Sequence, residues 1–348
     1  MIRQKCFALT ISLLLCVGLA FSGCKNPQQL TPTDQQSPAL EEQQYPDFEE
    51  DYYPAQWRPR SDHTDFLWEV IGGQGRVYLM GTMHAVSRSY ILTPELLDIF
   101  EEMDALALEI NVLDVEDMMD MLDFSFLPQG QTVLDHLSER GLIHLENMIE
   151  VYGLDFYSII SMAPFTISSV FMSEVLSMSS LDIPGGVDLL LNLHAWEMGM
   201  EIYVLEDWRD VFNNVNNLPA GTLERISILT IAPPEQSVEE LQYLYEVFRS
   251  GDTERVLALL SIDGEEEFIG GDGLPIIFEE IDERFDYYML EHRDRIMADS
   301  IISYLESGRN VFVAAGLAHF IGENSIICFL EEAGYQVVRV DLTQRMAA

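Results

Sequence analysis

The chain carries one short pattern twice, as VYLMGTMH at residues 77–84 and as VFVAAGLAH at residues 311–319. In each copy, an apolar run typical of a buried strand is followed by Gly-x-x-His. If the two strands are neighbours in one sheet, His84 and His319 converge at the same sheet edge. Imidazole serves both as a metal ligand and as a general acid or base, so the functional hypothesis begins with this repeat.

Both copies lie in segments that predict alternating strands and helices. Phe66 to Val70 alternates apolar and polar positions, and the glycine-rich turn 72–75 precedes the first copy, which together indicate a β-hairpin. Thr93-Pro94-Glu95 is typical of a helix start. Ala105 to Ile110 is then expected to be a buried strand, ending near the carboxylate of Glu109.

The middle of the chain reads as mostly helical. Helices are expected at Asp135 to Val151, Phe165 to Leu176 and Val187 to Met198, with further helices from Leu223 to Leu305, the last of them about Tyr288 to Leu305. Strands are expected at Ile202 to Leu205, Val311 to Ala315 and Gln336 to Val340, with a helix at Ser325 to Ala333. The pattern predicts an α/β fold: a mixed β-sheet core with an N-terminal hairpin, strand–helix units at both ends and a largely helical middle.

The first residues are typical of a targeting signal rather than of the folded domain. Residues 1–23 combine positive charge, the apolar run Phe7 to Phe21 and small residues before Cys24, as in a bacterial lipoprotein signal peptide with lipidation at Cys24. The alternative is an uncleaved signal anchor, although the run is short for a membrane span. We therefore expect a protein of the bacterial cell envelope, extracytoplasmic and attached to the membrane through an N-terminal lipid anchor.

Two further regions follow the signal. Residues 24–62 are rich in proline, glutamine and acidic residues, which predicts a disordered tether, and residues 63–348 form the expected globular domain. With Cys24 lipidated, Cys328 has no partner for a disulfide within the mature chain. The formal net charge of −41 excludes nucleic acid as an expected partner, because phosphate binding requires a basic surface.

Ionisable side chains follow four of the expected strands: His84, Glu109, Glu206 and His319. Ligands of α/β sheets collect beyond the strand ends. Imidazole and carboxylate together suit a divalent metal ion, with Zn, Mn, Co and Fe all open. The alternative interpretation is that the histidines cap loops and that the two carboxylates are solvated strand ends.

Several ordered motifs resemble the TraB/GumN family. They are Phe66 to Val70, Val77 to His84, Ala107 to Ile110, Gly186 to Asp188, Val204 to Glu206, Arg293-Asp294 and Ala315 to Gly322. That family is similar to the animal Tiki proteins, which are metal-dependent membrane-tethered proteases, and more distantly to erythromycin esterases and ChaN-like haem-binding lipoproteins. The chain differs from the family pattern at Asp294, where the family often has Asn, and at Ala318, where the family commonly has Gly.

The resemblance implies that His84, Glu109 and His319 face one pocket as metal ligands. Asp188, Glu206 and Arg293 would support them: Glu206 as a further ligand or general base, Arg293 as an oxyanion or substrate-carboxylate partner, and Asp188 in substrate binding.

Three functions stay open on the sequence. The chain is a lipid-anchored metal-dependent hydrolase of peptides or small esters and amides, a surface lipoprotein that captures a peptide or haem without turnover, or a domain with a vestigial pocket that acts through its surface.

Overall fold

The computed structural model describes residues 65–182, 186–260, 268–276, 281 and 284–342. The expected signal peptide over 1–23, with Cys24, and the expected tether over 24–62 lie outside these residues. Within them, no helix is both long enough and apolar enough to cross a membrane.

A six-stranded mixed sheet forms the core of the fold. Its strands lie in the order β10-β1-β2-β9-β4-β6, and β2, β9, β4 and β6 run parallel. The bounds are β1 Phe66–Ile71, β2 Val77–Thr82, β4 Ala105–Leu108, β6 Glu201–Val204, β9 Val311–Gly316 and β10 Gln336–Arg339. The two strands of the repeated pattern, β2 and β9, are direct neighbours, with Thr82 opposite Gly316. The expected mixed sheet and N-terminal hairpin are confirmed.

The hairpin between β1 and β2 depends on glycine at two positions. Gly72 has a φ of +114°, which side chains other than glycine rarely adopt. A Cβ on Gly75 would lie 2.0 Å from the carbonyl oxygen of Arg309, so the turn passes directly against the segment that leads into β9. The glycine-rich turn therefore both reverses the chain and lets its two ends approach closely.

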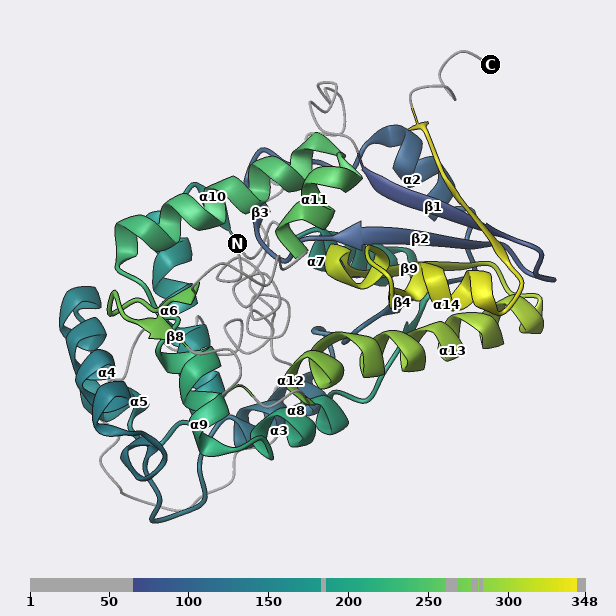
Figure 1. Ribbon diagram of the computed structural model, residues 1–348. Coiled ribbons are helices and arrows are strands. Elements are labelled where there is room, and N and C mark those ends of the chain that lie inside the picture. The colour runs from purple at the N-terminus through teal and green to yellow at the C-terminus, as the bar shows by residue number, and fades with distance from the viewer. Residues whose placement is uncertain (1–64, 183–185, 261–267, 277–280, 282–283, 343–348) are drawn as a thin grey trace, which may run out of the picture.

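Helices cover both faces of the sheet. Figure 1 shows α13 (His292–Ser307) and α14 (Ile326–Glu332) in front of the strands, and α2 (Pro94–Phe100) and α7 (Val187–Met198) on the other side. Thr93 caps α2 by accepting a hydrogen bond from the amide of Leu96 at 3.2 Å. Gly199, with a φ of +66°, ends α7 as the sequence predicts.

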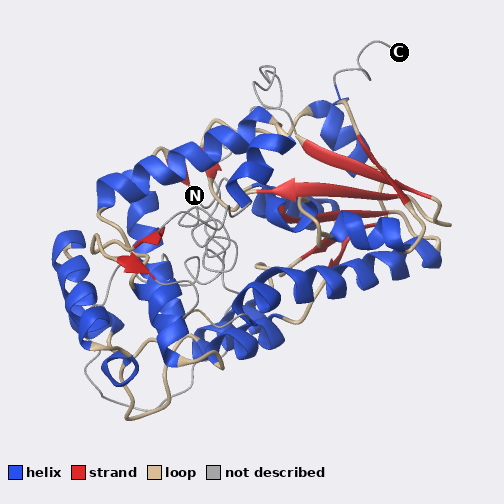
Figure 2. Ribbon diagram, in the orientation of Figure 1, coloured by secondary structure: helices blue, strands red, loops and turns tan. Residues whose placement is uncertain are grey.

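The helical half lies beyond the carboxyl ends of the parallel strands (Figures 1 and 2). Its helices are α3 Val115–Phe124, α4 Glu139–Tyr152, α5 Phe156–Ile159, α6 Pro164–Met178, α8 Trp208–Asn216, α9 Ala220–Leu223, α10 Pro234–Ser250, α11 Thr253–Leu260 and α12 Arg284–Asp286. Short 3₁₀ segments are η2 Val133–His136 and η7 Leu317–Phe320, and two π-helical turns are η4 Glu224–Ile228 and η6 Tyr287–Glu291. Two small two-stranded sheets pair β3 Val86–Ser87 with β5 Leu181–Asp182, and β7 Phe268–Ile269 with β8 Pro275–Ile276.

Two helix starts differ from the sequence prediction. The helix expected from Asp135 begins instead at Glu139, because Ser138 caps it through a hydrogen bond from the amide of Gly141 at 3.2 Å. Asp135 accepts a hydrogen bond from the amide of Thr132 and so closes the preceding 3₁₀ turn. The helix expected from about Tyr288 begins as the π-turn η6, and α13 follows it.

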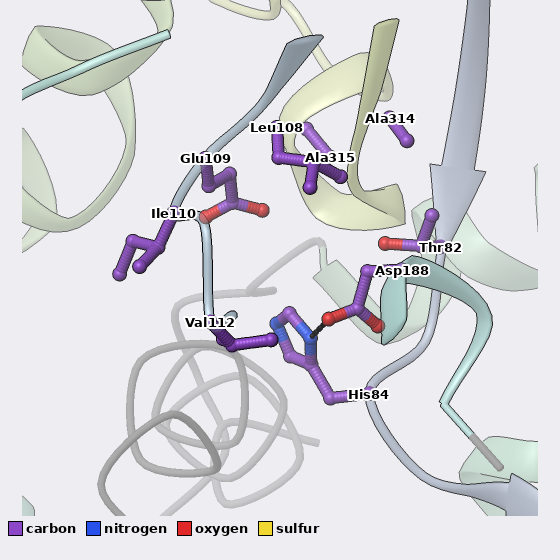
Figure 3. Close-up of a pocket in the computed structure, with 9 residues that line it drawn as sticks. All are labelled: Thr82, His84, Leu108, Glu109, Ile110, Val112, Asp188, Ala314 and Ala315. Carbon is purple, nitrogen blue, oxygen red and sulfur yellow. Dashed lines mark hydrogen bonds and ion pairs between the residues drawn. The ribbon is translucent and has the colours of Figure 1, made fainter. Parts of the chain in front are cut away.

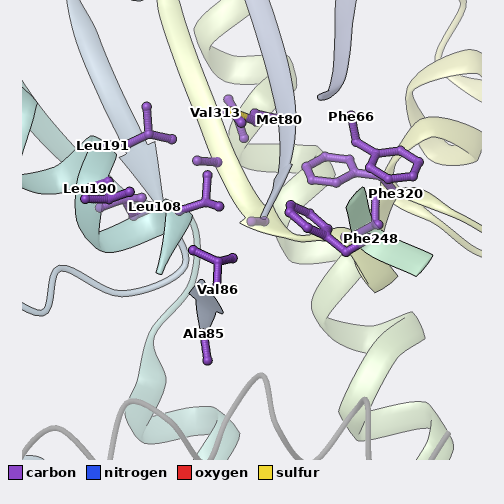
Figure 4. Packing of buried hydrophobic residues seen from close by; sticks show 14 of the residues in the cluster. Phe66, Met80, Ala85, Val86, Leu108, Leu190, Leu191, Phe248, Val313 and Phe320 are labelled. Carbon is purple, nitrogen blue, oxygen red and sulfur yellow. The ribbon is translucent and has the colours of Figure 1, made fainter. Parts of the chain in front are cut away.

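The core packs on both sides of the central strands, and Figure 4 shows part of it. Phe66 of β1 lies 6.1 Å, between ring centroids, from Phe248 of α10. Leu108 of β4 is buried beside Leu190 and Leu191 of α7. The contact between Phe66 and Phe248 joins the sheet to the helical half.

Candidate active site

The sequence-predicted residues meet at the carboxyl edge of the parallel strands, which points toward the helical half (Figure 1). His84 lies two residues beyond β2, Glu109 directly follows β4, and Glu206 lies two residues beyond β6. His319 belongs to η7, the 3₁₀ turn that follows β9. All four side chains are buried.

Arg293 connects two of the strand ends. It is the second residue of α13, and its side chain is only 2% exposed. Its Nε lies 2.9 and 3.0 Å from the two carboxylate oxygens of Glu206, and its Nη2 donates both to Glu206 and, at 2.5 Å, to Oε2 of Glu109. Burial lowers the pKa of Arg293, but the charges of Glu206 and Glu109 outweigh it, so the pKa lies above its usual value.

Glu109 is held from two sides. Its Oε1 accepts a hydrogen bond from the amide of Gly316 at 2.6 Å, while Arg293 holds Oε2. Burial raises the pKa of this carboxyl, but the positive charges of His319 and Arg293 outweigh burial and place the pKa well below the usual range. Glu109 is thus a fixed, ionised carboxylate at the centre of the sheet edge.

His319 is oriented by the residue that follows Arg293. Its Nδ1 lies 2.5 Å from Oδ1 of Asp294, and its Nε2 lies 3.6 Å from Oε2 of Glu109. Burial lowers the pKa of His319, but the charges of Asp294 and Glu109 raise it to about 9. Burial raises the pKa of Asp294 to about 6, and the charge of His319 offsets only part of that increase.

His84 has an equivalent carboxylate partner. Its Nδ1 lies 2.8 Å from Oδ2 of Asp188, in the first turn of α7. Burial lowers the pKa of His84, and the charge of Asp188 outweighs it, so the pKa is raised. A Cβ on Gly186 would lie 2.3 Å from the carbonyl oxygen of His84, so glycine is needed for α7 to begin this close to the histidine.

A small pocket lies between His84, Asp188 and Glu109, whereas His319, Glu206 and Arg293 are not among its lining residues (Figure 3). Glu109 lies across it from His84 and Asp188, and Thr82 borders it at the end of β2. The rest of the lining is apolar: Leu108, Ile110, Val112, Ala314 and Ala315. Its cavity volume of about 10 Å³ suits one atom-sized occupant such as a water molecule or an ion.

Three buried polar atoms around the pocket have no hydrogen-bond partner within the described part of the chain. They are Nε2 of His84, Oδ1 of Asp188 and Oγ1 of Thr82. Leaving a buried polar group unsatisfied costs about 1–3 kcal/mol, so three such atoms at one pocket point to an occupant that satisfies them.

The side chains present fit a divalent metal ion in their chemistry. Each histidine has its Nδ1 directed at a carboxylate; this leaves Nε2 of His84 available as a ligand atom, whereas Nε2 of His319 already faces Oε2 of Glu109 at 3.6 Å. Four carboxyl groups lie against three basic side chains, Arg293 and two histidines with raised pKa values, so one negative charge is left without a cationic partner. Across the described ranges, no three His, Cys, Asp or Glu side chains already stand together as a complete metal cluster.

Two members of the site were not identified from the sequence. The sequence marks Asp294 only as a departure from the family pattern, whereas it holds His319. Thr82 lies inside the repeated pattern, whose sequence points to the histidine alone. The glycine of the first repeat allows a close contact, because a Cβ on Gly81 would lie 2.5 Å from Cδ1 of Leu317. It permits η7 to pack against β2.

The sequence profile of the TraB/PrgY/gumN family matches residues 66–339. The chain belongs to this family. The resemblance noted on the repeated motifs is thereby confirmed, and the matched range contains every strand of the central sheet and every residue of the pocket. Searches of curated proteins and of solved structures gave no match.

Proposed function

We propose that this chain is a metal-dependent hydrolase that cleaves peptides, or small amides and esters, outside the cytoplasm. The observation that carries the proposal is Nε2 of His84, which has no hydrogen-bond partner among the described residues and lies in a pocket shared with the ionised carboxylate of Glu109. A histidine with Nδ1 fixed and Nε2 free is the arrangement that metal-ligating histidines adopt.

His84, Glu109 and His319 would hold the metal ion, with Zn, Mn, Co and Fe as candidates. A divalent ion at such a site polarises a substrate carbonyl and lowers the pKa of bound water. Asp188 and Asp294 each accept the Nδ1–H of their histidine, so Nε2 is the ligand atom, and His319, whose pKa is about 9, would release its Nε2 proton on binding the metal. Oδ1 of Asp188 borders the pocket and is available to contact substrate.

Within this proposal, Arg293 acts mainly on Glu109. Its Nε and Nη2 atoms are occupied by the two glutamates, so it holds Glu109 against the pocket and keeps it ionised. Glu206 balances the charge of the arginine from the other side. The roles expected from the sequence, Glu206 as ligand or general base and Arg293 toward substrate, stay predictions for kinetic tests.

The experiment compares wild type with His84→Ala and His319→Ala. Metal content is measured by mass spectrometry after purification without chelator, and peptide cleavage is followed by liquid chromatography. Both variants should lose bound metal and cleavage. The matched control is His194→Ala, because His194 also pairs with a carboxylate, Glu101, but lies outside the pocket. Cleavage that persists in both site variants would remove this site from the mechanism.

A second candidate function is peptide capture without turnover. It is favoured by the engagement of both oxygens of Glu109 by Arg293 and Gly316, which leaves the carboxylate less free to ligate a metal. Isothermal titration with candidate peptides, followed by mass spectrometry of the recovered ligand, separates the two functions. Tight binding with every peptide intact would favour capture.

We also propose that the domain is attached to the membrane through a lipid on Cys24, after removal of residues 1–23. The supporting observation is the apolar run that ends in Ser22-Gly23-Cys24. Labelling cells with radioactive palmitate should mark the wild-type protein and not Cys24→Ser. Equal labelling of both would contradict the anchor.

A further inference from the structure

A second pocket opens directly beside the first one. The two share Thr82 and His84, so the end of β2 forms the wall between them. Three residues of α10 and three of α11 supply most of the remaining lining, together with Met83 and two residues of η7. The helical half therefore encloses this second pocket, whereas the sheet edge forms the first.

The second pocket is apolar. Apart from Thr82 and His84, each side chain that the structure places in its lining is aliphatic, aromatic or methionine. The chain has a formal net charge of −41, yet this pocket beside a cluster of ionisable groups is apolar. A charged group would lose its hydration on entering the pocket, so the pocket strongly disfavours charged occupants.

The lining of this pocket is largely buried. Leu244, Leu259 and Leu260 keep 7 to 9% of their surface exposed, and Val247 keeps 1%. Covering such residues with another apolar group is favourable, because it removes apolar surface from water.

The size of the pocket limits its occupant. Its cavity volume is about 90 Å³. A cavity of about 150 Å³ in another protein accommodates a benzene molecule, so this smaller pocket suits a branched aliphatic side chain better than a large aromatic one.

Thr82 connects the two pockets chemically. Its Oγ1 is buried and, among the described residues, has no hydrogen-bond partner, and the residue lines both pockets. A hydrogen bond to a substrate amide would satisfy this atom while the neighbouring side chain fills the apolar pocket.

We propose that the pocket formed by α10, α11 and the end of β2 is a specificity subsite. It takes the valine- or leucine-like side chain next to the bond that is cleaved. This inference rests on the proposed hydrolase function, and it assigns Thr82 as a residue that positions the substrate amide.

The test uses peptides that differ only at the residue next to the cleaved bond, with Ala, Val, Leu, Trp or Asp at that position. Wild type should prefer Val and Leu over Asp by at least about tenfold in kcat/KM, the discrimination that a small apolar pocket provides. Thr82→Val should lower kcat/KM for all of these peptides, while bound metal is retained.

Two pocket variants should shift this preference in opposite directions. Val256→Phe fills the pocket and should lower kcat/KM for the Leu peptide by about tenfold or more, with the Ala peptide affected far less. Leu259→Ala enlarges the pocket and should raise the relative rate for Trp. The matched control is Leu257→Phe, because Leu257 lies on the same helix but is 42% exposed. Circular dichroism verifies that each variant is folded.

Failure of the subsite and failure of the hydrolase give different results. If wild type cleaves the peptides but Val256→Phe and Leu257→Phe show the same preference, the subsite is wrong and the hydrolase stands. If wild type cleaves none of them, the hydrolase is wrong. Isothermal titration of the same peptides then decides the subsite: weaker binding of the Leu peptide by Val256→Phe alone supports it, and equal binding by both variants overturns it.

Discussion

Arg293 and Asp294, which are consecutive residues at the start of α13, hold two different parts of the candidate site. The guanidinium of Arg293 binds Glu109 and Glu206, while the carboxyl of Asp294 binds Nδ1 of His319 at 2.5 Å. One helical turn thus fixes the ends of three neighbouring parallel strands, β6, β4 and β9. We expect a substitution at Arg293 to affect mainly the stability of the fold, and a substitution at Asp294 to affect mainly metal binding at the site.

Replacing Arg293 with Ala should destabilise the fold severely. The change leaves two carboxylates buried without their cation, and breaking a buried ion pair in this way costs about 3–5 kcal/mol. Urea denaturation measures the free energy of unfolding. The matched control is Arg295→Ala, because Arg295 is exposed and pairs with Glu291 at the surface, where an ion pair contributes about 1 kcal/mol or less. Similar losses in both variants would contradict the central role of Arg293.

Replacing Asp294 with Asn should leave the protein folded but weaken metal binding. An amide oxygen can still accept from Nδ1, so the orientation of His319 survives, but the negative charge that strengthens it as a ligand is lost. Loss of such a supporting partner typically lowers metal affinity by about 10–100-fold. Metal titration monitored by calorimetry measures the affinity. Asp299→Asn, at an exposed position of the same helix, should match wild type, and a wild-type affinity in Asp294→Asn would exclude the supporting role.

A third prediction concerns the pH dependence of stability. Burial alone would raise the pKa of Asp272, but hydrogen bonds from Arg140, at 2.7 Å from Nε, and from the amide of Leu274 lower it below 3.8. Because the folded-state pKa is lowered, the stabilisation is fully present above the unfolded-state pKa and disappears as the pH falls through the folded-state pKa.

The difference in urea midpoint between wild type and Asp272→Asn should therefore stay constant from about pH 7 to 5 and shrink below about pH 4. The same comparison in an Arg140→Gln background should show a much smaller pH effect. A difference that persists unchanged into strong acid would mean that the ion pair is not the source of the stabilisation.

The sequence predicted the sheet edge better than it predicted the contacts made there. The apolar runs before Gly81 and Gly316 indicate two strands, and the structure shows that these strands pair directly. The order of the other strands in the sheet could not be predicted, because the contacts that set strand order join residues far apart in the sequence. The late start of α4 was missed because Ser138, rather than a residue near Asp135, provides the cap.

The contacts of Arg293 could not be inferred from local pattern. Its partners Glu206 and Glu109 lie 87 and 184 residues away, and nothing in the sequence decides whether the guanidinium faces them or a substrate. Asp294 was visible only as a departure from a family pattern. Its burial and its contact with His319 come from the tertiary structure, since the two residues lie 25 positions apart in the sequence.

Replacing Gly186 with Ala should impair catalysis through the geometry of His84. The new Cβ would lie 2.3 Å from the carbonyl oxygen of His84. Because the atoms that it meets belong to the backbone of His84, they cannot rotate away, and the start of α7 must move. Asp188, two residues later, moves with it and shifts the imidazole that it holds. A displacement of about 1 Å in a catalytic group can lower the rate by about 100-fold, so we expect a loss of that order in kcat/KM.

The matched control for this prediction is Gly221→Ala. Its Cβ would meet only the flexible end of Arg225, at 2.9 Å, far along the chain from the pocket. Peptide cleavage should then be close to wild type. If Gly186→Ala keeps full activity and full metal content, the spacing between α7 and His84 does not set the geometry of the site, and the His84–Asp188 pair loses its proposed part in catalysis.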